Sequence, residues 1–588
     1  MKFVPVVLLS LLTCLPARAV DRSAFRFDVY NLEMRLDPAA SAITARGRIV
    51  LRNESNEPQR DVALQISSSL EWRLIEVVGS EKPPQYIIQN YTTDVDHTGA
   101  VTEAIVTLPK PVAPRGEVEL DIGYSGDIKA DATRLTRTGT PEAISKSSDW
   151  DQLSATLSAV RGPGHVVWYP ISMDAASLEQ GDLFAQLATW NEREAGAMLR
   201  TQFCWIADME EDSDQQPHLM VVANGRLQGL SQKNEEPGTE GARTGCSTYD
   251  FRLGRAPATF AIGDFQSLER AGVNVFYLGN HKQLAADYAY AGEKVEPVVS
   301  DWLGTPSEKV QIVELNDPNA FPFEAGSMLF TPLHALNESS LELQLAHQFA
   351  HASVHSTRGW IDEGLAEFMQ AVVRERQDGR KAAIEFMRRN LPALVEVEST
   401  VAVSGEHSTP AQPLLTAYDE IYIRVKAMYV WWMLRDMIGD IALQKAIKSY
   451  DGAEDKHANY LQRLFESTSK KDLEWFFDGW VYRDRGLPDF QIDSAYPRVT
   501  LNGTNVVTVT VEDTRGVGAE VPVRAQAGLG EVSKRLQVLP HEKAVLRLEV
   551  PTTPDDIVVN DGSVPEANTK NNVFKITKLP ETPATPPQ

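Results

Sequence analysis

The spacing of apolar residues changes twice along this chain of 588 residues, and these changes limit the folds open to it. Over residues 25–250, apolar and polar residues alternate in short segments, as in antiparallel β-structure, apart from a helical pattern near 183–199. Over 284–489 the apolar residues recur at helical spacing, with two short strands predicted at 310–317 and 327–333. The alternation of apolar and polar residues then returns. The pattern predicts an α+β multidomain protein with an N-terminal antiparallel β-domain, a mainly helical domain and a small C-terminal β-sandwich.

The same pattern places the domain boundaries. At roughly 150 residues per domain, the length suggests three or four folding units, each with its own core. The predicted segments are a signal peptide (1–19), an N-terminal β-domain (20–262), a helical domain (263–491), a β-sandwich (492–576) and a disordered Pro-rich tail (577–588).

Charge and composition exclude several classes of protein. The chain has 57 Lys and Arg against 81 Asp and Glu, a formal net charge of −24, so its average surface repels phosphate backbones. We therefore expect no nucleic-acid partner. Apolar residues make up 43%, and the longest apolar run after the N-terminus, 427–434, is too short to cross a bilayer as a helix. No transmembrane segment is predicted.

The N-terminus has the pattern of a secretory signal. Lys2 precedes an apolar run, and Ala17 and Ala19 are the small residues that a signal peptidase reads. The protein is therefore predicted to be secreted or periplasmic. Cleavage would leave Cys204 and Cys246, which either form one disulfide in an oxidising compartment or remain two buried thiols.

A metal site is indicated by His347 and His351, which are four residues apart in HQFAH. On a helix this spacing places both imidazoles on one face, so both can reach one ion. Catalytic zinc takes three protein ligands, and Glu363 in WIDEGLAEF is the best third candidate, because Gly359 can end one helix and Asp362 can begin another that returns beside it. His355, one further turn along the chain, is a lower-ranked rival.

These motifs resemble the aminopeptidase N family of gluzincin zinc metallopeptidases. HQFAH matches the family's H-E-x-x-H, and DEGLA matches its N-E-G-F-A, with a shorter connection between them. The segments FPFEAGSMLF, VKAMYVWWML and LEWFFDGWVYRDRGLPDF are similar to further family motifs in the same order. The resemblance implies a thermolysin-like helical domain, zinc as the cofactor and a peptide or protein as the substrate or ligand.

The residues that differ from the family pattern are ones that have catalytic or substrate-binding roles in the family. Gln348 replaces the glutamate that takes a proton from the attacking water, which an amide cannot do. Leu329 replaces the glutamate that holds the substrate's α-amine, in a substrate-binding strand that would also contain Gly326 and Met328.

A third departure concerns the oxyanion. Arg424 stands where the family has the tyrosine that stabilises it, with Tyr422 and Tyr418 close in sequence. Glu324 could reach the amine or, like Glu367, replace the missing base. We therefore predict a metallopeptidase-like protein with impaired hydrolysis; the alternative is a pseudoenzyme that binds peptides or acts as a scaffold.

Overall fold

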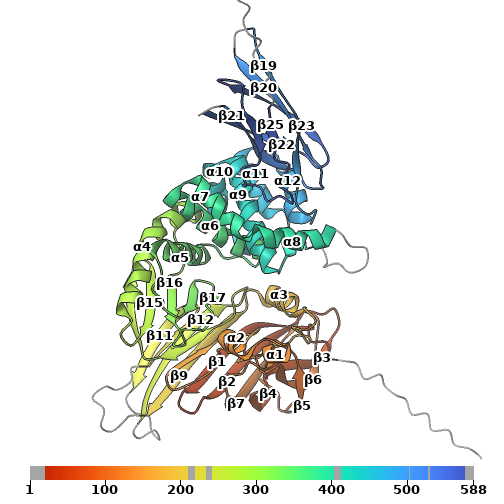
Figure 1. The fold of residues 1–588 in the computed structure, drawn as a ribbon. Coiled ribbons are helices and arrows are strands. Elements are labelled where there is room, and N and C mark those ends of the chain that lie inside the picture. The colour runs from red at the N-terminus through yellow and green to blue at the C-terminus, as the bar shows by residue number, and fades with distance from the viewer. Residues whose placement is uncertain are drawn as a thin grey trace, which may run out of the picture.

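The computed structural model describes residues 20–208, 219–233, 242–402, 412–501, 504–527 and 530–576. The predicted signal peptide and the predicted Pro-rich tail lie outside the described residues. The described chain forms an N-terminal group of β-sheets, a mainly helical middle region and a C-terminal pair of β-sheets, arranged in that order from bottom to top in Figure 1. The predicted α+β architecture is confirmed.

The N-terminal region is built on a seven-stranded sheet with two smaller sheets beside it. In spatial order the large sheet consists of β11 (Arg226–Lys233), β12 (Ala242–Arg252), β9 (Met198–Asp208), β1 (Phe25–Asp37), β2 (Ala42–Asn53), β7 (Glu117–Asp127) and β4 (Leu70–Val77). The smaller sheets are β3 (Gln59–Ser67), β6 (Ala100–Val112) and β5 (Gln85–Thr92), and β10 (Met220–Ala223), β13 (Phe260–Gly263) and β8 (Leu157–Val160). Three helices accompany them: α1 (Thr133–Arg137), α2 (Glu142–Ser148) and α3 (Leu183–Glu194).

One strand pair departs from the predicted antiparallel arrangement, because β1 and β9 run parallel. A long connection that includes α3 separates these two strands, and parallel neighbours require such a crossover. The helical pattern predicted near 183–199 corresponds to α3, which ends at Glu194, and β9 then begins at Met198. Cys204 of β9 lies opposite Cys246 of β12, and the two form a disulfide, which decides between the two alternatives left open by the sequence.

The middle region contains a five-stranded sheet and most of the helices. The sheet consists of β14 (Phe265–Arg270), β15 (Val273–Leu278), β16 (Val310–Glu314), β18 (Met328–Thr331) and β17 (Phe323–Ala325), and β16 and β18 are the two strands predicted there. The α-helices are α4 (Lys282–Leu303), α5 (Glu338–Ser353), α6 (Gly359–Asp378), α7 (Arg380–Met387), α8 (Leu391–Ala402), α9 (Ala427–Ile438), α10 (Asp440–Lys448), α11 (Tyr460–Ser469) and α12 (Glu474–Phe477). Short turns of 3-10 helix, η1 (Arg388–Asn390), η2 (Leu414–Thr416) and η4 (Gly452–Glu454), and of π-helix, η3 (Ile421–Lys426) and η5 (Asp478–Tyr482), join them.

The packing of α6 against α9 depends on a glycine. A Cβ atom at Gly364 would lie 2.6 Å from the Cβ of Ala427 and 3.0 Å from the indole nitrogen of Trp431. Only a residue without a side chain allows the two helices to approach so closely. This contact holds the N-terminal half of α6, which contains Glu363, against the core.

The C-terminal region is a sandwich of two antiparallel sheets, as predicted. One sheet consists of β19 (Phe490–Val499), β20 (Asn505–Asp513) and β23 (Lys543–Val550), and the other of β22 (Gly530–Val538), β21 (Ala519–Ala527), β24 (Asp556–Val559) and β25 (Val573–Lys575). Its buried residues continue the core of the helical region without a break, and the indole of Trp480 donates to the carbonyl of Gly518 at 2.8 Å. The N-terminal region has a core of its own, which ends at Ile262.

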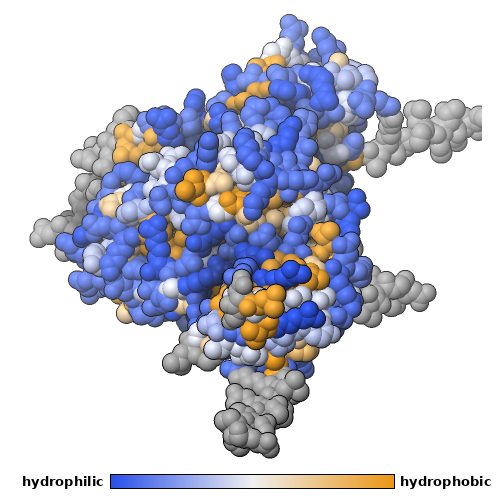
Figure 2. Space-filling model, turned by 90° about the horizontal axis from the view of Figure 1, so that it is seen from above, coloured by the Kyte–Doolittle hydropathy of each residue, from blue (hydrophilic) through white to orange (hydrophobic). Residues whose placement is uncertain are grey.

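The surface is mostly hydrophilic. Figure 2 shows small apolar patches separated by polar residues on the face seen from above, as expected for a chain with a net charge of −24. Among the described residues, no helix is both long and apolar enough to span a membrane.

Candidate metal centre

Two buried histidines on α5 form the base of the site. The side chain of Asn337 caps the start of this helix by accepting from the amide of Ser340 at 2.9 Å. His347 and His351 follow three turns later, are 2% and 3% exposed, and have their Nε2 atoms 3.1 Å apart. The structure therefore brings the predicted pair to one point, as the four-residue spacing requires.

Glu363 reaches the same point from α6. Its Oε2 atom lies 3.7 Å from Nε2 of His347 and 3.8 Å from Nε2 of His351. The chain turns between the two helices over residues 354–358, so Gly359, predicted to end the first helix, is instead the first residue of the second. A Cβ atom at Gly359 would lie 2.8 Å from both Arg255 and Ile423, so close packing explains the glycine.

Glu324 supplies a fourth donor that the sequence did not assign to the metal. It lies on β17, in a hairpin with β18 that turns through Gly326 at a φ of +65°. Its Oε2 atom is 3.1 Å from Nε2 of His347. The four side chains place one ligand atom each within 4.8 Å of one another.

This donor set fits zinc. Bonds of about 2.0–2.2 Å from a tetrahedral zinc to nitrogen and oxygen require its ligand atoms to be roughly 3.3–3.6 Å apart. The three separations among His347, His351 and Glu363, which are 3.1, 3.7 and 3.8 Å, bracket that range. Oε2 of Glu363 is also buried without a hydrogen-bond partner among the described residues, although Arg424 is close enough for an ion pair.

Further polar side chains hold the two imidazoles from behind. Gln370 contacts Nδ1 of His347 at 2.9 Å, and Asp362 lies 3.6 Å from Nδ1 of His351. A hydrogen bond to the far nitrogen, as Gln370 makes to His347, orients a metal-binding imidazole, whereas Nδ1 of His351 has the Asp362 carboxylate nearby but no hydrogen-bond partner among the described residues. Burial alone would lower the pKa of His351, but Asp362, Glu363 and Glu324 outweigh it and raise that pKa to about 9. No sequence motif indicates Gln370, although its spacing of seven from Glu363 places it two turns further along α6.

Gln348, which the sequence resemblance predicts to replace a general base, lies on the buried face of α5. Gln348 is fully buried, and neither polar atom of its amide has a hydrogen-bond partner within the described part of the chain. Glu367, considered as a replacement base, lies 3.9 Å from Nδ1 of His347, at the ring nitrogen opposite the one facing the other donors. Glu324 already contacts His347 and Arg424.

Arg424, on the π-helical turn η3, spans the carboxylates of the site. Its Nη2 atom is 3.0 Å from Oε2 of Glu324 and 3.1 Å from Oε2 of Glu363, and its Nε atom is 2.5 Å from Glu420. Burial would lower the pKa of Arg424, but these carboxylates raise it above its usual value. The guanidinium is therefore a fixed positive charge beside the metal donors.

Tyr422 points away from the donors. Its hydroxyl donates to Asp484 at 3.3 Å, within a buried network in which Lys426 contacts Asp484 at 3.0 Å and Glu398 at 2.6 Å. A hydroxyl held in this way is not available to an oxyanion at the metal. Of the two tyrosines considered, Tyr418 is the one that lines the cleft described below.

The strand β18, predicted to contribute to substrate binding, has two different faces. Leu329 and Gly326 line the cleft, whereas Met328 is fully buried in a core cluster with Phe330, as alternation along a strand requires. Met328 is therefore a core residue and does not face a ligand. His355, the rival zinc ligand, is 55% exposed and contacts Ser307 and Glu308, so it does not join the donors.

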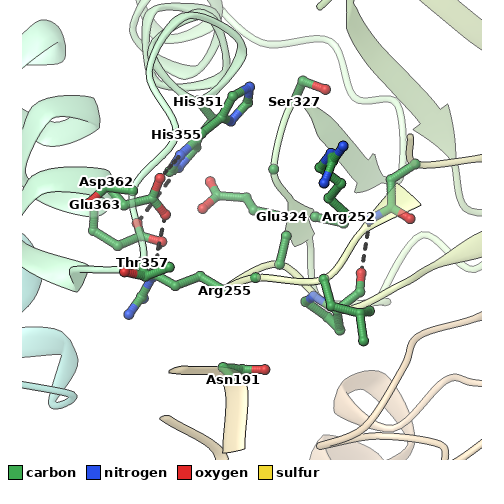
Figure 3. Close-up of a pocket in the computed structure, with 18 of the residues that line it drawn as sticks. Asn191, Arg252, Arg255, Glu324, Ser327, His351, His355, Thr357, Asp362 and Glu363 are labelled. Carbon is green, nitrogen blue, oxygen red and sulfur yellow. Dashed lines mark hydrogen bonds and ion pairs between the residues drawn. The ribbon is translucent and has the colours of Figure 1, made fainter. Parts of the chain in front are cut away.

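The donors open onto a large cleft between the N-terminal and helical regions, with a volume of about 1650 Å³. Figure 3 shows Asp362 and Glu363 on one side, Arg252 and Ser327 on the other, and Asn191 of α3 below. Arg255 connects the two regions, because it lies 3.4 Å from Asp362 and 3.8 Å from Glu363.

A second group of potential ligands, Asp149, Asp151 and His165, lies in the N-terminal region. Arg134 binds the carboxylate of Asp149 through two contacts of 2.7 and 2.8 Å, and Arg161 contacts Asp151 at 2.6 Å. Because guanidinium groups already satisfy both carboxylates, we interpret this group as a buried ion-pair network.

No family model and no curated protein matches this chain. Similar solved structures include an M1 zinc metallopeptidase from Deinococcus radiodurans and a mutant of an M1 zinc metallopeptidase from the same organism. Each has a TM-score of 0.47 and 14% identity, and the match covers 78% of this chain and 94% or 95% of theirs. Membership of the aminopeptidase N family stays a prediction.

Proposed function

We propose that this chain is a secreted or periplasmic zinc-binding protein related to the metallopeptidases, in which peptide hydrolysis is impaired. His347, His351 and Glu363 would hold the ion, with Glu324 as a further donor. The disulfide between Cys204 and Cys246 supports an oxidising compartment.

The observation that carries this proposal is the uncharged, buried Gln348 one residue after the first donor. Bound zinc supplies a Lewis acid that polarises a peptide carbonyl. The chain must then accept a proton from water and deliver it to the leaving amine, and Gln348 can do neither. Loss of a positioned general base costs about 10² to 10⁴ in rate.

The alternative is a pseudoenzyme that binds peptides. Two observations favour this alternative. Leu329 is 1% exposed and offers no charge to a substrate α-amine, and Glu324 would fill the coordination position that a catalytic zinc keeps open. The cleft would then bind a polypeptide without cutting it.

The test compares the wild-type protein with Gln348→Glu for zinc content and for turnover of aminoacyl reporters. The matched control is Gln344→Glu, which adds the same charge one turn earlier on α5. We expect wild-type turnover far below the usual range of about 1 to 10³ per second, and a rise in Gln348→Glu smaller than the roughly 10² to 10⁴ of a complete base. Wild-type turnover within the usual range, abolished by a chelator, would overturn the proposal.

A triple variant separates the two candidates. Gln348→Glu, Leu329→Glu and Arg424→Tyr together should raise activity beyond the product of the three single effects, because residues that act as a unit are strongly non-additive. A triple variant that binds zinc and remains inert would favour the peptide-binding protein. Full activity in Gln348→Glu alone would show that Leu329 and Arg424 do not occupy the roles assigned to them.

A further inference from the structure

The donor Glu324 lies on an edge strand of three residues. Within the described chain, β17 pairs only with β18, and the turn between them passes through Gly326. The five-stranded sheet therefore holds one side of β17 through a short ladder of hydrogen bonds. In Figure 3 the side chain of Glu324 points toward Asp362 and Glu363. The contacts on the other side of β17 decide whether this carboxylate stays there.

The N-terminal region supplies those contacts. Phe321, just before β17, donates its amide to the carbonyl of Ser147 at 2.8 Å, and its own carbonyl accepts from the indole nitrogen of Trp150 at 3.0 Å. Trp150 is 8% exposed and shares one core cluster with Ala325 and Phe330 of the hairpin. Hydrogen bonds and a common core thus attach the hairpin to the N-terminal region.

Phe323 makes a further contact from β17 itself. Its ring lies 5.1 Å from the ring of His165, edge to face, and 5.0 Å from the guanidinium carbon of Arg161. Successive side chains of a strand point to opposite faces, so Glu324 faces the other way. Its Oε2 atom there lies 3.1 Å from Nε2 of His347. The grip on Phe323 therefore fixes the direction in which Glu324 points.

Arg161 is itself held in place. Its side chain is 4% exposed, and its Nη2 atom contacts Asp151 and the carbonyl of Ser148, each at 2.6 Å. Its guanidinium carbon also lies 4.0 Å from the ring centroid of Trp150. A cation over an aromatic ring is attracted more strongly when it is shielded from water. Trp150 and Phe323 therefore pack against one immobile, buried cation.

We propose that Trp150 and Phe323 are positioning residues of the metal centre, through which the N-terminal region holds Glu324 where the other three donors converge. Trp150 acts through its hydrogen bond to the backbone of Phe321, and Phe323 acts through its ring. The inference rests on the proposed function in taking the four donors as a zinc site.

The test measures zinc affinity against a competing chromophoric chelator. Phe323→Leu removes the ring contacts, and Trp150→Phe removes the hydrogen bond to Phe321 while keeping an aromatic ring. Each variant should bind zinc about tenfold more weakly, at the lower end of the roughly 10–100-fold loss that follows removal of a group supporting a metal ligand. Phe323→Tyr keeps the ring and should stay within about twofold of wild type.

A second measurement separates positioning from a general loss of stability. In a Glu324→Ala background the same two substitutions should change zinc affinity by less than about twofold, because they act through that carboxylate. The matched control is Phe276→Leu, which removes a ring from the same core cluster on β15. It should lower the unfolding temperature, as Phe323→Leu does, and leave zinc affinity unchanged.

Three results would overturn the inference while leaving the zinc site in place. They are wild-type affinity in both Phe323→Leu and Trp150→Phe, an equal loss of affinity in the Glu324→Ala background, and a comparable loss in Phe276→Leu. A wild-type protein that binds no zinc would instead overturn the proposed function, and this inference with it.

Discussion

Replacing Arg424 by methionine should tighten zinc binding. The Nη2 atom of Arg424 lies 3.0 and 3.1 Å from the two donor carboxylates, Glu324 and Glu363. A divalent ion between those oxygens would repel the guanidinium, which would have to give up one or both contacts. It would keep its contact with Glu420 and its proximity to Glu367.

The size of the effect follows from these contacts. A hydrogen bond to a charged group is worth about 1.5–3 kcal/mol, and the Arg424 side chain is 32% exposed, so solvent screening favours the lower part of that range. At about 1.4 kcal/mol per factor of ten, Arg424→Met should bind zinc about ten- to thirty-fold more tightly. The metal-free variant should also be less stable, because two neighbouring carboxylates lose their counter-charge.

The assay is a zinc titration against a competing chromophoric chelator, with thermal unfolding followed in the presence and absence of the metal. Lys448→Met is the control, since it removes one cation from the same cleft without contacting a donor. Its zinc affinity should stay close to that of wild type. Unchanged or weaker zinc binding in Arg424→Met would show that the guanidinium does not oppose the ion.

Three further outcomes are expected. In His347→Ala/His351→Ala the zinc content, measured by elemental analysis, should fall from about one ion per chain to none. An unchanged zinc content would contradict the assignment of these residues as donors. Burial raises the pKa of Asp513 to about 6 from an ordinary 3.8, so the folded state keeps a proton that the unfolded chain has lost, and stability falls as pH rises from about 4 to 6. Asp513→Asn should reduce this slope, to which Glu566, whose pKa burial raises to about 7, also contributes, and should stabilise the protein by at most about 3 kcal/mol at pH 7.5 in denaturant titrations; an unchanged slope would contradict the assignment. Gly364→Ala should destabilise by about 1–2 kcal/mol despite the better helix propensity of alanine, because the new Cβ would meet Ala427 at 2.6 Å; a more stable variant would show that α6 can move aside.

Local patterns in the sequence were sufficient to predict much of the fold and several of the candidate metal donors. Hydrophobic periodicity predicted the β–α–β order of the three regions, because side-chain spacing follows directly from the backbone hydrogen bonding of each element. The four-residue spacing of His347 and His351 predicted their convergence for the same reason. Glu363 was predicted because the helix that contains it follows closely in the chain. The predicted loss of a general base at Gln348 rests on a single residue of the sequence and stays a prediction.

The tertiary structure decided which side chains surround His347 and His351. Glu324 reaches His347 from a hairpin 23 residues away, and Arg424 reaches Glu324 across 100 residues. Tyr422 turns into a buried ion network, although it is only two residues from Arg424. Such approaches depend on how α5, α6, the hairpin and η3 pack around a shared core, and no spacing along the chain encodes that packing. The sequence therefore determined which side chains could bind a metal, whereas the packed core decided which charges surround them.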